Sequence, residues 1–307
     1  MTIFQTTLNQ MLVLFFFIVI GMLLKRKNIL PDNAGTVMSR METYVLFPAL
    51  IINNLMTKCT LENIASRGYY FIFAIGILAA VYPVAVVLSN ALTKDRITKY
   101  IYRYSFMISN FGFVGNAVVN GVFGADMLFE FLIFTIPLSF FTYSVGFAWL
   151  VPGGTKKDTL KRALLNPTII ALGVGIVLGI TNFPMPKFAV DAISAAASSM
   201  TPVAMLLTGF VIGGYKFKEL ITKPVIYFVS LTRLVFIPFV VVSVLKLLNV
   251  PETLTIVALG FLAMPLGLNT IVFPAAYGGD TRLGAGMALI SSALAVITIP
   301  AMFAILL

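Results

Sequence analysis

Ten long apolar runs divide this chain, and they constrain its fold more than any other feature. Each run is about 20 residues long, which is the length an α-helix needs to cross ~30 Å of hydrocarbon. The runs lack the strict alternation of an outer-membrane β-barrel. Since backbone groups in lipid must be satisfied within their own segment, the runs predict an all-α, multi-pass membrane protein. The expected spans are residues 6–24, 36–56, 68–91, 101–123, 127–150, 167–183, 189–213, 224–246, 254–277 and 285–306.

Composition agrees with a membrane protein and disfavours several classes of function. Hydrophobic residues make up 60% of the 307 positions and charged residues only 10%, against about 25% in a soluble domain. The chain has no histidine, which removes Ser–His and Cys–His catalysis and His-ligated metals. Cys59 is the single cysteine, so disulfides within the chain and multi-cysteine metal sites are excluded. No GxxxxGK[ST] loop is present to bind nucleotide phosphates. We therefore expect no enzyme, no metal site and no resident cofactor.

The basic residues are distributed unequally between the two sides of the expected spans. With the N-terminus outside, four of the 21 Lys and Arg residues lie on the outer side, Arg233 lies within a span, and the other sixteen lie on the inner side. Cytoplasmic loops carry this kind of positive excess. The net charge of +10 is thus a topology signal, and no nucleic-acid partner is expected. The sequence predicts a protein of the cytoplasmic (inner) membrane with both termini outside and no cleaved signal.

The two halves of the chain share landmarks at one spacing of 154 residues, which predicts an internal repeat. Five spans per half is an odd number, so the second half must enter the membrane in the opposite orientation. The expected organisation is a first five-helix repeat over residues 1–150, a cytoplasmic linker over 151–166 and a second, inverted five-helix repeat over 167–307. The landmarks pair Gly21 with Gly175, Pro48 with Pro202, Gly124 with Gly278 and Asp126 with Asp280.

The fourth and ninth spans contain residues that weaken a membrane helix. Residues 109–121 include three Asn and three Gly, and residues 264–274 include two Pro, one Gly and one Asn. Each Gly costs a helix about 1 kcal/mol relative to Ala, and an unpaired amide in lipid costs several kcal/mol. Two weakened spans at corresponding places in two halves are the best sequence pointer to a transporter's binding site. We therefore expect both spans to be broken, with their freed backbone groups facing a ligand.

The candidate binding residues follow from these two interruptions. The N–H end of a half-helix attracts a carboxylate and the C=O end attracts a cation. Close helix packing is the alternative role for the Gly and Asn residues. The expected substrate-binding residues are Asn110, Asn116, Asn120, Pro265, Asn269, Thr270 and Arg233, and the expected hinges are Gly112, Gly115, Pro48, Pro202, Pro265 and Pro274.

Two charged residues lie well inside expected spans. Arg233 is near the middle of the eighth span, where a charge is costly and normally faces the protein interior. Two roles stay open for it: it holds a substrate carboxylate, or it pairs with Glu42 or helix-end carbonyls as a structural lock. Glu42, in the second span, is a candidate for ion coupling, as are Asn116 and Asn269. Both Na⁺ and H⁺ are candidate coupling ions.

Several short segments occur in an order that is typical of one family. They are VLFPAL at 45–50, SNFGFVGN at 109–116, Asn166-Pro167, and the stretch from Met264-Pro265 to Asp280. In these segments the chain resembles the bacterial members of the auxin efflux carrier family, which are similar to the PIN carriers and to the bile acid:sodium symporters. The resemblance implies a scaffold domain and a transport domain, with the fourth and ninth helices broken and crossed near mid-membrane. It also implies export of small organic anions and a homodimer formed through scaffold helices.

Together these features predict a secondary active or potential-driven transporter. Its substrate is expected to be a small organic anion, moved by elevator-type alternating access within the lipid bilayer. The alternative is a non-transporting receptor or sensor that binds a small acid or a lipid. The short loops offer no output domain, which counts against that alternative.

Overall fold

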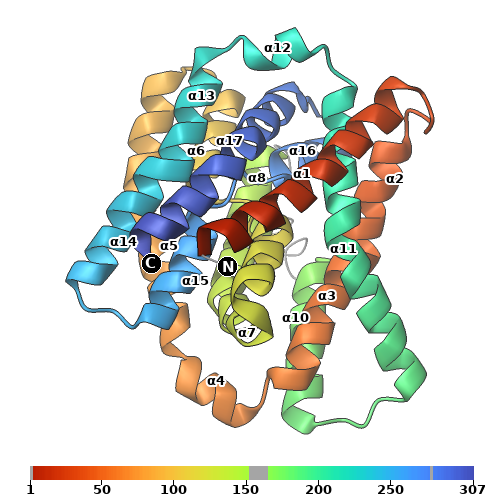
Figure 1. Ribbon diagram of the computed structural model, residues 1–307, viewed down its shortest axis with the longest axis vertical. Coiled ribbons are helices and arrows are strands. Elements are labelled where there is room, and N and C mark those ends of the chain that lie inside the picture. Colours follow the sequence, from red (N-terminus) through yellow and green to blue (C-terminus); the bar gives the residue numbers. More distant parts are fainter. Residues whose placement is uncertain (1–2, 152–164, 277–278) are drawn as a thin grey trace.

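The computed structural model describes residues 3–151, 165–276 and 279–307, and these residues are helical almost throughout (Figure 1). In this part of the chain, six helical segments are long and apolar enough to cross a membrane. The prediction of an all-α, multi-pass membrane protein is therefore confirmed. The expected linker at 151–166 lies almost entirely outside the described residues. The six segments are Ile3–Arg26, Ala65–Leu92, Phe111–Leu150, Lys187–Gly213, Pro224–Leu247 and Arg282–Leu306, and Pro167–Thr181 and Glu252–Leu262 are shorter apolar helices.

One group of helices, called the first bundle here, takes its members from both halves of the chain. In it α1 lies along α11, and α3 lies along both α10 and α11 (Figure 1). A π-helical turn, η1, joins α2 to α3. The members are α1 (Ile3–Arg26), α2 (Ala34–Met41), η1 (Glu42–Leu46), α3 (Phe47–Lys58), α10 (Pro167–Thr181) and α11 (Lys187–Gly213).

The remaining long helices form a second bundle, which also draws on both halves. Here α5 packs on α6 and α7, α15 packs on α7 and α14, and α17 packs on α13. Helix α1 contacts α7 and α17, so it joins the two bundles. The members are α5 (Tyr69–Leu92), α6 (Arg96–Met107), η2 (Phe111–Gly115), α7 (Asn116–Phe141), η3 (Thr142–Gly146), α8 (Phe147–Leu150), α13 (Pro224–Leu231), η4 (Thr232–Phe236), α14 (Ile237–Leu247), α15 (Glu252–Leu262), α16 (Asn269–Ala276) and α17 (Arg282–Leu306).

Glycines bring the helices of the first bundle into backbone contact. A Cβ atom added at Gly209 would lie 1.8 Å from the carbonyl oxygen of Ile18, and one added at Gly21 would lie 2.1 Å from that of Leu206. Small residues at such seams let membrane helices approach closely, since lipid supplies no hydrophobic drive for association. The α1–α11 seam is therefore a tight and sequence-specific contact.

The ends of several helices are fixed by side chains or by a special backbone conformation. The Asp95 carboxylate accepts a hydrogen bond from the Thr98 N–H at the start of α6 (2.7 Å), and this bond holds the pKa of Asp95 below its usual value. Asn166 caps α10 in the same way through the Thr168 N–H. Gly124 divides α7 with a φ of 82°, a conformation that favours glycine. Residue 124 falls between the expected fourth and fifth spans.

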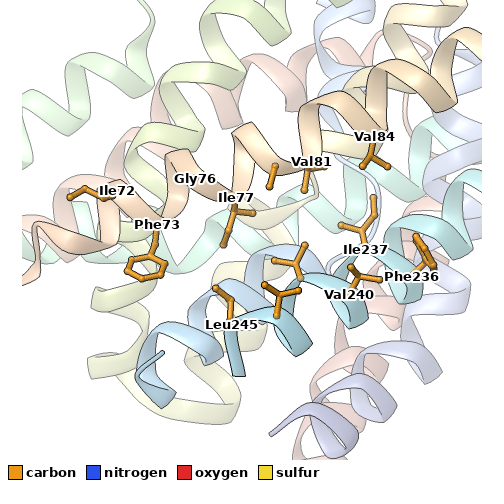
Figure 2. Close-up of a pocket in the computed structure, with 13 residues that line it drawn as sticks. Ile72, Phe73, Gly76, Ile77, Val81, Val84, Phe236, Ile237, Val240 and Leu245 are labelled. Carbon is orange, nitrogen blue, oxygen red and sulfur yellow. The ribbon is translucent and has the colours of Figure 1, made fainter. Parts of the chain in front are cut away.

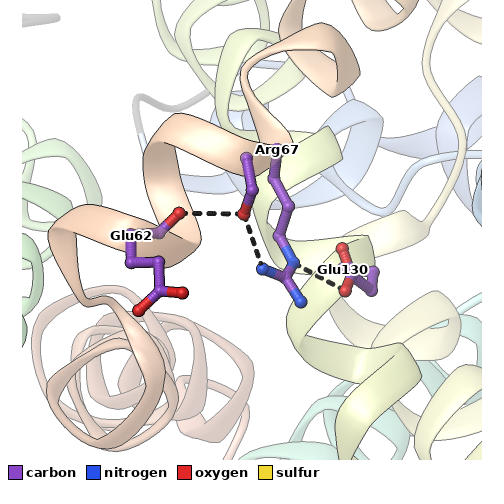
Figure 3. A network of polar contacts seen from close by, with 4 residues as sticks. Glu62, Arg67 and Glu130 are labelled. Atoms are coloured by element: carbon purple, nitrogen blue, oxygen red, sulfur yellow. Dashed lines mark hydrogen bonds and ion pairs between the residues drawn. The ribbon is translucent and has the colours of Figure 1, made fainter.

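A polar network joins α7 to the short helix α4 (Leu61–Arg67) (Figure 3). Helix α4 lies at the opposite end of the molecule from α12 (Phe217–Ile221) (Figure 1). Arg67 Nε donates to Glu130 Oε1 (2.7 Å), and Arg67 also donates to the Ser66 hydroxyl. The Ser66 hydroxyl in turn donates to the Glu62 carbonyl oxygen. The Arg67 and Glu130 side chains are 27% and 17% exposed, so solvent screens this pair only in part.

We expect Glu130→Gln to lower the melting temperature slightly, because it weakens this half-buried ion pair. The effect should be about 1 kcal/mol and should shrink at high salt. Scanning fluorimetry of detergent-purified protein at two salt concentrations measures it. Lys187→Gln is the matched control, since the Lys187–Asp191 pair is largely exposed and should contribute nothing measurable. Equal shifts in the two variants would contradict the assignment.

Candidate functional site

Two helix interruptions from opposite halves of the chain lie against each other. Helix α6 ends at Met107 and the chain becomes helical again at Phe111; α15 ends at Leu262 and α16 begins at Asn269. The non-helical segments between them, residues 108–110 and 263–268, are joined by an isolated antiparallel β-bridge between Ser109 and Leu266. The Asn110 N–H donates to the Pro265 carbonyl oxygen (2.8 Å). Each interruption therefore satisfies part of the backbone of the other.

Side chains reinforce this pairing. The Ser109 hydroxyl donates to the Phe261 carbonyl oxygen at the end of α15 (2.6 Å), and the Leu266 N–H donates to the Ser291 hydroxyl of α17 (3.1 Å). The Asn269 amide donates to the Tyr104 hydroxyl of α6 (2.9 Å). The arrangement places the C=O ends of α6 and α15 and the N–H end of α16 in one buried region, which carries partial charges of both signs.

Arg233 adds a full positive charge to this region. Its side chain is 0% exposed, and one terminal nitrogen donates to the same Phe261 carbonyl oxygen that Ser109 uses (3.2 Å). The guanidinium carbon lies 5.0 Å from the centre of the Phe261 ring. Its Nε and Nη1 atoms have no hydrogen-bond partner among the described residues. The expected ion pair between Arg233 and Glu42 does not form, because neither carboxyl oxygen of Glu42 has a hydrogen-bond partner within the residues described. Two donor nitrogens of Arg233 are thus buried without a hydrogen-bond acceptor in the described part of the chain.

Two of the predicted asparagines are also buried with unused atoms. The Oδ1 atoms of Asn110 and Asn116 lack partners within the described chain, while the Asn116 amide donates to the Gly112 carbonyl oxygen (2.8 Å). Asn116, Thr135 and Ser139 line a small cavity of about 20 Å³. A water molecule needs roughly 10–15 Å³, so this cavity accommodates one water.

Asn120 does not belong with these residues. It is exposed, although it lies only one turn beyond the buried Asn116. The helix face that it shares with Asn116 leaves the buried region within that turn. Thr270 is buried, but its hydroxyl donates to the Gly267 carbonyl oxygen of its own turn (3.0 Å).

The predicted break at Gly112 and Gly115 is wrong in position. The chain leaves the helix at Ile108, and both glycines lie inside η2. A Cβ atom at Gly112 would lie 3.0 Å from the Phe47 ring, and one at Gly115 would lie 3.0 Å from the Phe131 ring. These glycines therefore make room for aromatic side chains, which is the packing role that the sequence left open.

The prolines occupy three kinds of position. Pro265 lies within the second interruption, where its carbonyl accepts from Asn110. Pro274 and Pro202 lie inside α16 and α11, which continue through them. Pro48 lies in the first turn of α3, directly after η1. A hinge role for these residues stays a prediction.

Sequence reasoning missed four π-helical turns. The segment η1 begins at Glu42, η2 directly follows the first interruption, η3 contains Tyr143, and η4 contains Arg233. Such turns occur frequently at functional sites, because they re-aim side chains and free backbone groups. The only sequence signal was indirect: Glu42 and Arg233 are charges inside apolar runs.

Two larger cavities differ in chemistry. A groove of about 470 Å³ between α5 and α14 is lined by thirteen residues with no polar side chain (Figure 2). It offers nothing to bind an anion and suits hydrocarbon. A chamber of about 340 Å³ lies between the first bundle and α16, and it has Lys25, Asp32, Thr36 and Ser39 in its wall. Lys25 and Asp32 form an ion pair there, which holds the pKa of Asp32 below its usual value.

The helices and the buried polar region define a multi-pass α-helical membrane protein whose interior holds paired helix interruptions. The family model described as membrane transport protein matches residues 6–159 and, a second time, residues 154–303. The chain belongs to this membrane transport family, and the resemblance to the auxin efflux carriers is thereby confirmed. A search of curated proteins finds no match.

Proposed function

We propose that this protein is a secondary transporter that carries a small organic anion across the cytoplasmic membrane. The observation that carries the proposal is Arg233, a fully buried guanidinium with two unused donors beside the paired interruptions. An unpaired charge in a membrane interior is costly and marks a functional site. A carboxylate suits a guanidinium fork, which presents parallel N–H donors.

The other groups of the site suit the same kind of ligand. Helix α16 begins at Asn269, and its N-terminus turns the positive end of the helix dipole toward the region. The Thr270, Ile271 and Val272 N–H groups already donate to the Gly267 and Leu268 carbonyl oxygens, so the dipole and not free N–H groups is what this end offers an anion. Asn116 and the water-sized cavity beside it supply a second polar contact. The buried setting favours a small ligand. The proposed binding residues are Asn110, Asn116, Pro265, Asn269 and Arg233.

For the movement we propose an elevator mechanism in which the first bundle is the scaffold and the second is the transport domain. The proposal includes ten spans arranged as two inverted repeats, and corresponding helix bounds in the two halves support the repeat. A shift of 154 residues places α5 (Tyr69–Leu92) on residues 223–246, and the pair α13 and α14 covers 224–247. The same shift places α6 on 250–261, where α15 covers 252–262. The chamber between the first bundle and α16 is the proposed route from the cytoplasm. A homodimer through the scaffold helices, which the family resemblance implies, is part of the same proposal.

Asn116→Ala tests the site. A thermal-shift screen of purified protein against mono- and dicarboxylates first selects a ligand, because a ligand that binds the folded state raises its stability. We then expect Asn116→Ala to reduce counterflow in liposomes at least ~10-fold, which is the cost of leaving buried polar groups unmatched.

The control for this experiment is Asn120→Ala, which removes the same side chain one turn away at an exposed position. It should transport within about twofold of the wild type, as surface substitutions rarely matter. Equal counterflow rates in Asn116→Ala and Asn120→Ala would show that Asn116 does not bind the substrate. Tight binding by the wild type with no counterflow would favour the receptor alternative.

A further inference from the structure

Glu42 is a buried acid that the proposed anion site does not use. It is 1% exposed, and neither carboxyl oxygen has a hydrogen-bond partner among the described residues. It begins η1, which packs against α2, α3, α10 and α11. A carboxylate in such surroundings, without a cation, is strongly disfavoured relative to its neutral form.

In the part of the chain that the structure describes, the ionisable groups around Glu42 offer no compensating charge. On α3 the ionisable residue is Lys58, at the opposite end of that helix from η1. Helix α10 contains no ionisable residue, and Arg40 of α2 is exposed. On α11 the charged residues are Lys187 and Asp191, which pair with each other in its first turns. Tyr143 of η3 is the ionisable side chain that interacts with Glu42, and it also lies close to the Thr168 hydroxyl.

Water in the chamber can reach the neighbourhood of Glu42. Ser39 lines the chamber, and it precedes Glu42 by three residues on the same helix. Residues three apart lie on one helix face, one turn from each other. The wall of the chamber at Ser39 therefore lies about one helical turn from Glu42.

Buried polar side chains occur near Glu42 and near the helix interruptions. Tyr143 follows Thr142 in η3, and both side chains lie near the Tyr104 side chain of α6. The Tyr104 hydroxyl accepts the hydrogen bond from Asn269 at the start of α16. Thr142 and Thr168 each have a hydroxyl oxygen without a partner in the described part of the chain. Tyr143 therefore lies near both Glu42 and the Tyr104 side chain that bonds to Asn269, although the hydrogen bonds of the described residues do not join these groups into a continuous path.

We infer that Glu42 is a proton-binding site that couples anion transport to H⁺ movement in the same direction. The inference rests on the proposed function. When an anion neutralises Arg233, a charged Glu42 would leave an uncompensated negative charge in the membrane interior, so the anion-loaded state favours the protonated carboxyl. Glu42 itself stays in the scaffold, and movement of the second bundle past it changes the side of the membrane with which it exchanges the proton. When water from the chamber reaches the carboxyl group, its O–H bond breaks, the proton passes to the water, and the electron pair stays on the carboxylate. A proton neutralises this group without the surrounding oxygen ligands that a metal cation requires.

The direct test needs no anion. Infrared difference spectra of purified protein, recorded against pH, should contain the C=O band of a protonated carboxyl at neutral pH. Glu42→Gln should remove this band, whereas Glu219→Gln, at an exposed position on α12, should keep it. A band that survives in Glu42→Gln, or no band in the wild type, would overturn the inference. Should Glu42→Gln fail to fold, Glu42→Asp keeps an acid there, and the band should shift in frequency; an unshifted band overturns the inference.

The functional test uses radiolabelled malonate and benzoate as probes in liposomes. An imposed pH gradient should drive accumulation at least ~10-fold above equilibrium in the wild type and in Glu219→Gln, and this accumulation should be lost in Glu42→Gln. Accumulation in Glu42→Gln equal to that of the wild type would overturn the proton site, as would a wild type driven by a Na⁺ gradient and indifferent to pH. Absence of wild-type counterflow with every probe would instead contradict the transport function itself.

Discussion

Replacing Arg233 with methionine is expected to abolish anion transport and to leave the protein at least as stable as the wild type. The guanidinium is fully buried, its charge is unpaired, and two donors are unused. Removing the cation from a buried charge pair typically costs 2–5 kcal/mol, which corresponds to a loss of about 30-fold or more. Replacing a buried charge by an apolar side chain of similar volume is often neutral or stabilising.

Two measurements separate this outcome from a structural role for Arg233. Counterflow in liposomes reports transport, and the melting temperature with and without the anion reports stability and binding. We expect Arg233→Met to lose both transport and the ligand-induced shift. Arg233→Lys should be intermediate, because it keeps the charge but lacks the planar fork. A lowered melting temperature with transport intact would mean that Arg233 only locks the end of α15.

The second large effect is expected at the seam between α1 and α11. Gly209→Leu would place a side chain where the Ile18 carbonyl oxygen lies 1.8 Å from the Cβ position. Backbone cannot yield as a flexible side chain does, so the two helices must separate. Overpacking costs typically 1–3 kcal/mol and more where backbone must move, which is a large share of the ~5–15 kcal/mol that holds a typical protein folded.

Gly173→Leu is the matched control, because a Cβ atom at Gly173 on α10 meets nothing within 4 Å. Folded yield and apparent melting temperature in detergent measure both variants. Gly209→Leu should give little folded protein, whereas Gly173→Leu should resemble the wild type. Similar folded yields and melting temperatures for the two variants would show that α1 and α11 can move apart at little cost in stability.

Some of this structure was predictable because it depends on length and polarity. Apolar runs of the length of a bilayer predicted a helical, multi-pass protein, and the Asn, Gly and Pro residues of two spans directed attention to the segments that pair. The buried position of Arg233 followed from the cost of a charge in lipid. These are properties of single segments, which a sequence displays directly.

Features that depend on tertiary neighbours were not predictable. Gly112 and Gly115 appeared to mark a break, but their role is to admit the rings of Phe47 and Phe131 from other helices. Asn120 appeared equivalent to Asn116, yet only the packing around α7 decides which of the two is buried. The π-helical turns carry no composition of their own, so their coincidence with Glu42 and Arg233 emerges only in the fold.

The hydrogen bond from Asn110 to Pro265 has a consequence for synthesis of the protein. A nascent chain that has inserted only its first half holds residues 108–110 in the bilayer with polar backbone groups that the second half will later satisfy. Unsatisfied groups in lipid cost several kcal/mol each. The half-made protein therefore keeps an exposed weak point until residues 263–268 arrive.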